Sequence, residues 1–179
     1  MKRFFVATLS VIAASACGKS PFAISPADVR FAVDRDSYLA LAQHTAPALA
    51  RYEFRVVARL ENASATTLYL PRCYPDSRVP LYAVPLADEQ SPHSSAYNPV
   101  WACVGHDHPI ALPSRATRVD TLRVVGPTAV QHGTNIPIGK LEGDFALVLS
   151  VSSCPPDATD CPSASALTLR RRFRVLLER

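Results

Sequence analysis

The feature that most constrains the fold of this chain is an alternation of apolar and polar residues with a period of two. It is clearest over residues 52–61, where Tyr, Phe, Val, Ala and Leu alternate mainly with charged residues. The same period recurs at 29–33, 145–151 and 167–177. Successive side chains of a β-strand point to opposite faces, so this period predicts strands with one face in the core. The 16 prolines, against only 6 glycines, further disfavour long helices.

The predicted strand at 167–177 carries a row of arginines, Arg170, Arg172 and Arg174, on its outer face. Arg171 interrupts the apolar inner face, so we expect a bulge or an exposed end there. The arginine row suits contact with anionic lipid headgroups or polysaccharide. It equally suits the solvated outer face of an edge strand, where charged side chains prevent aggregation with other chains.

Shorter strands are predicted at 67–70, 81–84, 100–104 and 119–125, separated by turn-forming residues. Asn62 and Ser64 can hydrogen-bond their own backbone and so turn the chain after the strand at 52–61. Residues 38–50 are predicted as a strand end followed by a loop, because Pro47 cuts the apolar run short. Without a βαβ unit or an internal repeat, about eight strands indicate an all-β, antiparallel sandwich.

The N-terminus has the form of an export signal. Lys2 and Arg3 precede the apolar residues 4–16, a run too short to span a bilayer as a helix but typical of a signal peptide. The small residues 14–16 then lead directly into Cys17. This boundary resembles the lipobox of bacterial lipoproteins, which implies that Cys17 is lipidated and becomes the first residue of the mature protein. The alternative is ordinary secretion with cleavage after residue 16, which leaves Cys17 as a free thiol.

We therefore divide the chain into a lipoprotein signal peptide (1–16), a short tether (17–26) and one domain (27–179). The lipobox resemblance implies an exported protein, lipid-anchored to the cell envelope, and Gly18 after the cysteine favours the outer membrane where the cell has one. Without residues 1–16, 17 basic side chains stand against 15 acidic ones. This balance argues against a nucleic-acid partner, which normally requires a strongly basic surface.

The cysteine count fits this location. Once Cys17 of the five cysteines carries lipid, four remain, and an even set in an exported chain predicts disulfides. Of the three possible pairings we favour Cys73–Cys103 and Cys154–Cys161, because the second pair flanks a Pro-Pro-Asp turn. A zinc site built from the four cysteines is the alternative, although the sequence contains no C-x-x-C pair.

The order of several short motifs resembles bacterial exported lipoproteins with a single immunoglobulin-like β-sandwich domain. These motifs are LENAS (60–64), LYLPRC (68–73), WAC (101–103), IALPS (110–114) and EGDF (142–145). The order is also distantly similar to that of intracellular proteinase inhibitor domains, with an Asn-Ser turn and a late Gly-aromatic strand. The resemblance implies an antiparallel immunoglobulin-like sandwich of about seven to nine strands. It implies no defined activity.

One polar cluster could carry chemistry. His106 and His108 form a His-x-His pair that, on a strand, would point both imidazoles to one side and could bind copper or zinc with Cys103 or Asp107. The alternative is a solvated loop. The sequence has no Gly-x-Ser-x-Gly, His-Glu-x-x-His or glycine-rich phosphate loop, so we expect neither an enzyme nor a cofactor.

These observations favour a membrane-tethered, non-enzymatic binding or assembly module whose partner is an envelope protein or a polysaccharide. The predicted binding surface is the rim formed by residues 74–96 and 104–109, with Tyr74 and Tyr82 as anchors beside His106 and His108. Two alternatives remain: a proteinase-inhibitor-like domain that acts through an inserted loop, and a metal-binding envelope protein that uses the two histidines.

Overall fold

The computed structural model describes residues 22–43, 51–72, 79–90, 108–126, 129–130, 137–138 and 141–179. The strands are β1 (Val29–Val33), β2 (Ser37–Gln43), β3 (Arg51–Asn62), β4 (Leu68–Leu70), β5 (Tyr82–Pro85), β6 (Ile110–Leu112), β7 (Thr117–Gly126), β8 (Ala129–Val130), β9 (Pro137–Ile138), β10 (Gly143–Ser152) and β11 (Ala166–Leu177). The described 3-10 turns are η1 (Pro26–Asp28), η2 (Leu86–Asp88) and η4 (Ser163–Ser165). The all-β class is confirmed. In these ranges no helix has the length and apolar character needed to cross a membrane.

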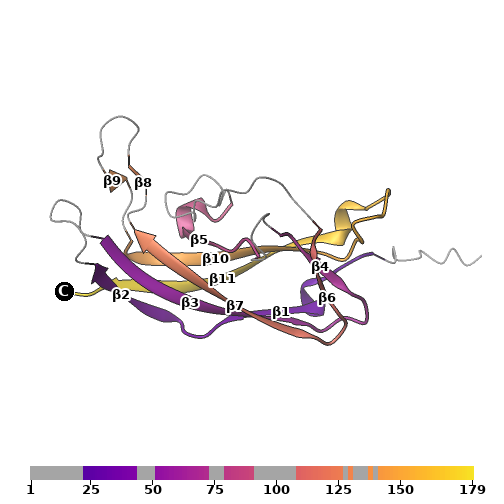
Figure 1. Ribbon diagram of the computed structural model, residues 1–179, viewed down its shortest axis with the longest axis horizontal. Helices are drawn as coiled ribbons and strands as arrows, with labels where there is room; N and C mark the ends of the chain where they lie inside the picture. Colours follow the sequence, from indigo (N-terminus) through magenta and orange to yellow (C-terminus); the bar gives the residue numbers. More distant parts are fainter. Residues whose placement is uncertain are drawn as a thin grey trace, which may run out of the picture.

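The long strands form two layers that face each other (Figure 1). In one layer β3 lies between β1 and β7 and pairs antiparallel with both. In the other layer β10 pairs antiparallel with β11 on one side and with β4 and β5 on the other, and β6 continues beyond β4. β8 and β9 form a separate hairpin. Strands adjacent in these ladders are often distant in the sequence.

β2 joins the two layers and corrects the expected strand directions. It pairs antiparallel with the beginning of β3, at Leu41↔Glu53, but parallel with β11 from Ser37↔Arg174 onward. The sheet is therefore mixed, and the prediction of a purely antiparallel sandwich is wrong. The parallel pairing arises because the chain leaves β3 after β1 and crosses to the opposite layer. There β2 lies beside β11, which runs in the same direction.

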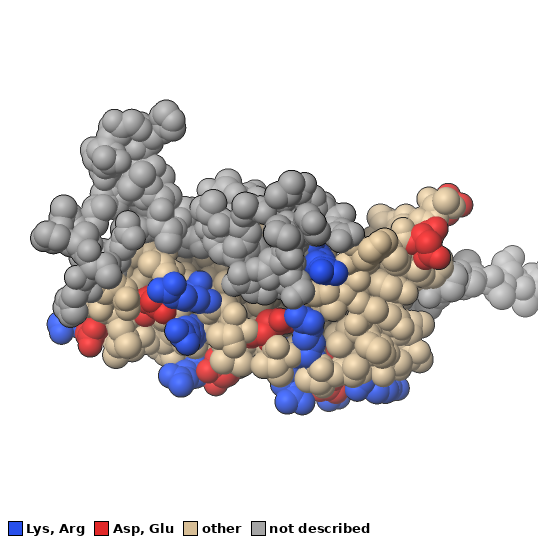
Figure 2. Space-filling model, in the orientation of Figure 1, with Lys and Arg blue, Asp and Glu red and all other residues tan. Residues whose placement is uncertain are grey.

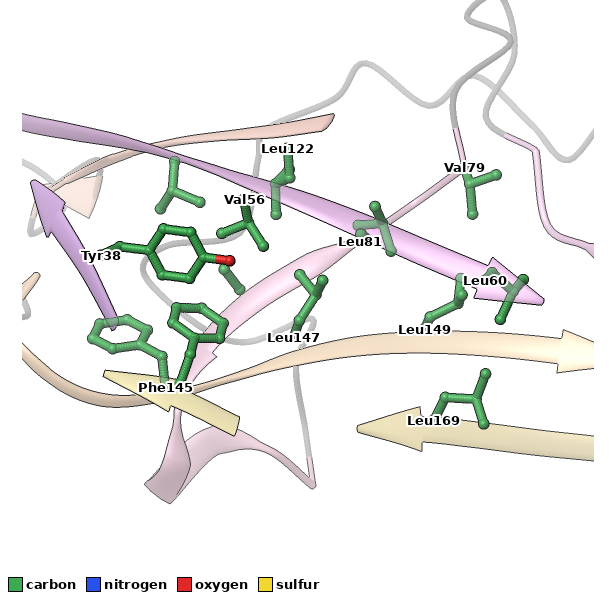
Figure 3. Packing of buried hydrophobic residues seen from close by; sticks show 14 of the residues in the cluster. Tyr38, Val56, Leu60, Val79, Leu81, Leu122, Phe145, Leu147, Leu149 and Leu169 are labelled. Carbon is green, nitrogen blue, oxygen red and sulfur yellow. The ribbon is translucent and has the colours of Figure 1, made fainter. Parts of the chain in front are cut away.

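The core lies between the two layers, where the inner faces of the strands pack together (Figure 3). Phe54, Val56 and Leu60 of β3 are buried, and Phe145 and Leu147 of β10 face them. These are the positions that the period of two assigns to the inner face, so this assignment is confirmed in both strands. Burial of large apolar side chains such as these is the main term that stabilises a domain of this size.

β10 is buried on its outer face as well. Ala146 and Val148 point away from the main core and pack with Val84 in a second cluster, against which Tyr82 and Leu86 also lie. The alternation alone did not predict this second cluster. β10 instead has the unbroken apolar run that is typical of a strand covered on both faces.

The shorter strand predictions at 67–70, 81–84 and 119–125 are confirmed as β4, β5 and β7 within two residues. The predicted strand at 100–104 lies outside the described residues. The β10–β11 register is continuous from Gly143↔Val175 to Ser152↔Ala166, so the ladder has no bulge at Arg171. The Arg171 side chain is exposed and lies 3.8 Å from Asp36. β2 pairs with β11 only from Arg174 to Leu177, so in the described chain no strand covers that side of β11 before Arg174.

Asn62 fixes the turn at the end of β3. Its side chain is fully buried, and its Oδ1 accepts hydrogen bonds from the backbone N and the hydroxyl of Ser64, at 3.0 and 2.6 Å. Its Nδ2 donates to the carbonyl oxygens of Thr66, Leu112 and Pro113, at 2.7, 3.0 and 3.0 Å. The predicted Asn-Ser turn is therefore confirmed, and the same amide also ties this turn to the chain between β6 and β7.

The described end of the tether lies against the domain. The backbone N of Ile24 donates to the carbonyl of Ala164 at 3.0 Å, and the Ile24 side chain packs against the main core. The Ser153 hydroxyl donates to the carbonyl of Phe22. The chain therefore enters the domain beside the turn that joins β10 to β11.

Candidate functional site

The structure joins Cys154 and Cys161 by a disulfide in the turn between β10 and β11, as their spacing predicted. Their Cα atoms are 5.9 Å apart, which is an ordinary separation for a disulfide. On the loop-entropy account, closing so short a loop stabilises the fold by about 2.5 kcal/mol. Cys17, Cys73 and Cys103 lie outside the described residues, so the lipidation and the second disulfide stay predictions.

The predicted rim is described only in part, over residues 79–90 and 108–109. Tyr82 lies in β5 and is half-buried against the second cluster, and this burial raises the pKa of its hydroxyl. His108 is exposed just before β6. Tyr74 and His106 lie outside the described residues, so the grouping of the four anchors stays a prediction.

The metal site also stays a prediction. In the described part of the chain, no three His, Cys, Asp or Glu side chains come close enough together to hold a metal ion. Cys103 and Asp107, the ligands expected beside His106 and His108, lie outside that part.

The arginine row of β11 points outward and binds neighbouring segments of the chain. Arg172 contacts Glu89 Oε1 at 2.9 Å, and Arg170 donates to Gln90 Oε1 at 3.3 Å. Arg174 donates to Asp144 Oδ1 at 3.0 Å. Because Glu89 and Gln90 directly follow η2, the first two arginines hold this segment over the outer face of β10. Figure 2 shows basic and acidic side chains interspersed on the viewed face.

A gap between β2 and β3 is the most distinctive surface feature of the described chain. The β3 ladder with β1 ends at Ala58↔Val33, and its ladder with β2 begins only at Glu53↔Leu41. Between these points no described strand pairs with β3 on that side, because the chain has bowed away toward β11. An open groove of roughly 600 Å³ lies here and reaches Tyr38 and Phe54 of the core.

Asp34 closes one end of this gap. Its backbone N donates to the carbonyl of Val57 at 3.0 Å, and its Oδ1 accepts from the backbone N of Val57 at 2.9 Å and from the Tyr38 hydroxyl at 2.7 Å. Burial raises the pKa of the Asp34 carboxyl, but these hydrogen bonds outweigh it, so the pKa lies below its ordinary value. Burial, and then the bond to Asp34, raise the pKa of Tyr38 far above its ordinary value. At neutral pH the Asp34 carboxyl is therefore ionised and the Tyr38 hydroxyl is neutral.

Three exposed leucines lie beside the gap. Leu39 and Leu41 point outward from β2, and Leu176 is the Cα partner of Leu39 in the parallel ladder. They are 54%, 49% and 47% exposed. We call these leucines together with the adjoining β2–β3 gap the seam surface. Neighbouring exposed apolar side chains of this kind are candidates for an interaction site.

Charged groups flank the seam surface. Glu53 accepts a hydrogen bond from Arg123 at 2.6 Å and lies 3.7 Å from Arg55. The Arg123 hydrogen bond, only partly opposed by burial, lowers the pKa of Glu53. At the other end Arg35 lies 3.4 Å from Asp34. An apolar strip with paired charges at both ends suits an amphipathic polypeptide segment better than a highly charged ligand.

Sequence reasoning missed the seam surface. Residues 38–41 are apolar at every position, so the alternation could not separate the buried Tyr38 and Ala40 from the exposed Leu39 and Leu41. The separation follows from the pairing of β2 with β11, which lies more than a hundred residues away in the sequence.

Comparison with known proteins adds little to this description. No protein-family model matches the chain, and no curated protein matches it. Among solved structures, the chain is similar to one described as "X-ray structure of Northeast Structural Genomics Consortium target SoR45". That similarity covers 83% of this chain and 87% of the other, with 11% identity and a TM-score of 0.42.

Proposed function

We propose that this protein is a lipid-anchored lipoprotein of the cell envelope whose domain is a non-enzymatic binding or assembly module. The basic and apolar N-terminus, followed by small residues and Cys17, supports export and lipidation. The Cys154–Cys161 disulfide fits an oxidising compartment outside the cytoplasm. The partner is an envelope protein, and the membrane is reached through the N-terminal lipid.

The domain is, in this proposal, a variant of the immunoglobulin-like sandwich. Its β1–β3–β7 ladders follow the order A-B-E of that fold, and β5–β10–β11 follow C-F-G. β2 then corresponds to a continuation of the first strand that crosses to the opposite sheet beside the last strand. Such sandwiches provide a rigid framework on which a binding surface can be built.

The observation that supports a binding role best is the seam surface. An exposed apolar strip beside a gap in a sheet can take an extended segment of a partner, whose apolar side chains cover Leu39, Leu41 and Leu176. Interface energy usually concentrates in a few such buried side chains. The apolar character of the strip favours a protein partner over a polysaccharide.

Replacing Cys17 by serine tests the anchor. We expect the wild-type protein to partition into the detergent phase with a lipid-modified N-terminal cysteine. The Cys17→Ser variant should be soluble or should retain residues 1–16, because serine has no thiol to accept the lipid. Phase partitioning and mass spectrometry of the N-terminal peptide measure both results. An unmodified Cys17 at the mature N-terminus would refute the lipid anchor but would leave the binding role untouched.

Replacing two of the leucines tests the binding role. In photo-cross-linking and affinity capture from detergent-solubilised membranes, the Leu39→Ser/Leu176→Ser variant should recover at least about tenfold less partner than the wild type. Its melting temperature should change little, because both side chains are exposed. Ala111→Ser is the control, since Ala111 is also apolar and exposed but lies on β6, outside both the seam surface and β7. Equal capture by the double variant would contradict binding at the seam surface.

A further inference from the structure

β7 has a long edge that no described strand covers. It pairs with β3 from Tyr52↔Gly126 to Glu61↔Thr117, and in the described chain no strand pairs with its other side. The backbone N of Asn62 donates to the carbonyl of Ala116, so the carbonyl of Ala116 points toward β3. Because backbone groups alternate in direction along a strand, those of Thr117, Val119 and Thr121 point to the uncovered edge. Such an edge is a template for a further strand.

The sequence of this edge is chemically self-complementary. It is Thr117-Arg118-Val119-Asp120-Thr121. If two copies run antiparallel with Val119 opposite Val119, then Arg118 of each copy lies opposite Asp120 of the other, and Thr117 lies opposite Thr121. Opposite charges and threonine pairs at directly facing positions both favour strand pairing.

The neighbouring registers lack this complementarity. Moving one copy by two residues in one direction places Asp120 opposite Asp120, and moving it in the other direction places Arg118 opposite Arg118. Like charges at facing positions are destabilising. A slip by a single residue is excluded because it would turn the facing side chains to opposite faces of the sheet. The charges therefore select the register centred on Val119.

The side chains at this edge are arranged for such a contact. Val119 is 57% exposed, the highest value among the large exposed hydrophobic residues of the described chain. Arg118 donates to both carboxylate oxygens of Asp120, at 2.7 and 2.6 Å, so the pair is neutral and held in place before any association. A groove of about 290 Å³ lies beside the strand, between Leu122 and the buried Leu81. Two copies thus meet without net charge repulsion.

We propose that two copies of this protein associate through their β7 edges as an antiparallel strand pair with a two-fold axis at Val119. The pairing is isologous, so each contact occurs twice and the assembly closes as a dimer. The five paired residues of each copy exchange about six backbone hydrogen bonds. An interface this small belongs to the weak, reversible class.

Charge reversal tests the register. In sedimentation equilibrium of the purified full chain in detergent, the wild type should approach twice the monomer mass as the concentration rises toward ~1 mM. Arg118→Asp and Asp120→Arg should each raise the dissociation constant by about tenfold or more, because every facing charge pair becomes like-charged. An equimolar mixture of the two variants should associate again, since each acidic pair then faces a basic pair. The Arg118→Asp/Asp120→Arg double variant should associate like the wild type.

Cross-linking provides a second test that does not depend on charge. The two Val119 Cα atoms should lie about 5.5 Å apart, within disulfide reach, so oxidised Val119→Cys should form a covalent dimer through residue 119. Thr121→Cys is the matched control, because its two copies would lie about 14 Å apart along the strands. Peptide mass spectrometry distinguishes these links from those of the natural cysteines. A wild type that stays monomeric to ~1 mM, a mixture that does not associate, or equal cross-linking at both positions overturns the proposal. Arg118 and Asp120 would then be charges that block edge-to-edge association.

Discussion

Replacing Phe173 by alanine is expected to destabilise the domain by about 4 kcal/mol, because it leaves a cavity at the centre of the aromatic cluster. The Phe173 ring centroid lies 5.1 Å from that of Tyr38, 6.0 Å from that of Phe54 and 6.2 Å from that of Phe145. These rings come from four different strands, so one side chain links β2, β3, β10 and β11. Urea unfolding followed by fluorescence or circular dichroism measures the loss.

Two controls separate the cavity from a general effect on β11. Phe173→Leu should cost about 1 kcal/mol, because leucine keeps most of the apolar volume. Arg174→Ala removes an ion pair with Asp144 in which both side chains are exposed, on the other face of the same strand, and should change the stability little. If Phe173→Ala costs no more than Arg174→Ala, the aromatic cluster does not hold the layers together.

Replacing Asn62 by alanine is expected to cost about 3 kcal/mol. The substitution removes the donor that the carbonyl oxygens of Thr66, Leu112 and Pro113 share, and the bond to Leu112 is buried with the Asn62 side chain. Hydrogen exchange at Ser64 should accelerate as well, because its backbone N loses its acceptor. Thermal or urea unfolding gives the stability, and exchange monitored by NMR gives the local effect.

An aspartate at the same position distinguishes the donor from the shape of the side chain. Asn62→Asp has nearly the same volume and keeps the acceptor for Ser64, but at neutral pH its carboxylate has no N–H to give to the three carbonyls. It should therefore be at least as unstable as Asn62→Ala. A variant with wild-type stability would show that the Nδ2 hydrogen bonds do not hold the turn. Thr66→Ala, on the exposed part of the turn, serves as the control.

Much of the fold could be predicted because the relevant signals are local. The alternation in β3 identified its buried face, the Asn-Ser pair identified the turn after it, and the short Cys154–Cys161 spacing identified a disulfide. Each of these features involves residues within about ten positions of one another in the sequence. Such signals are the most reliable part of sequence interpretation.

The remaining features depend on which distant segments meet. The parallel pairing of β2 with β11 has no signature in residues 37–43, because parallel and antiparallel strands of similar composition look alike over so short a length. The exposure of Leu39 and Leu176 follows from that pairing and was missed with it. The second buried face of β10 depends on η2, which covers Ala146 and Val148 from elsewhere in the chain.

The pairing of β2 with β11 also has a consequence for the order in which the domain can fold. β2 begins at Ser37, whereas its partner strand ends at Leu177, and Glu178 adds a hydrogen bond to the carbonyl of Ala40 at 2.9 Å. A ribosome makes the first of these segments more than a hundred residues before the second. Contacts between such distant segments are slow to form. β2 must therefore wait for β11, and Tyr38 becomes fully enclosed only after Phe173 has joined the core.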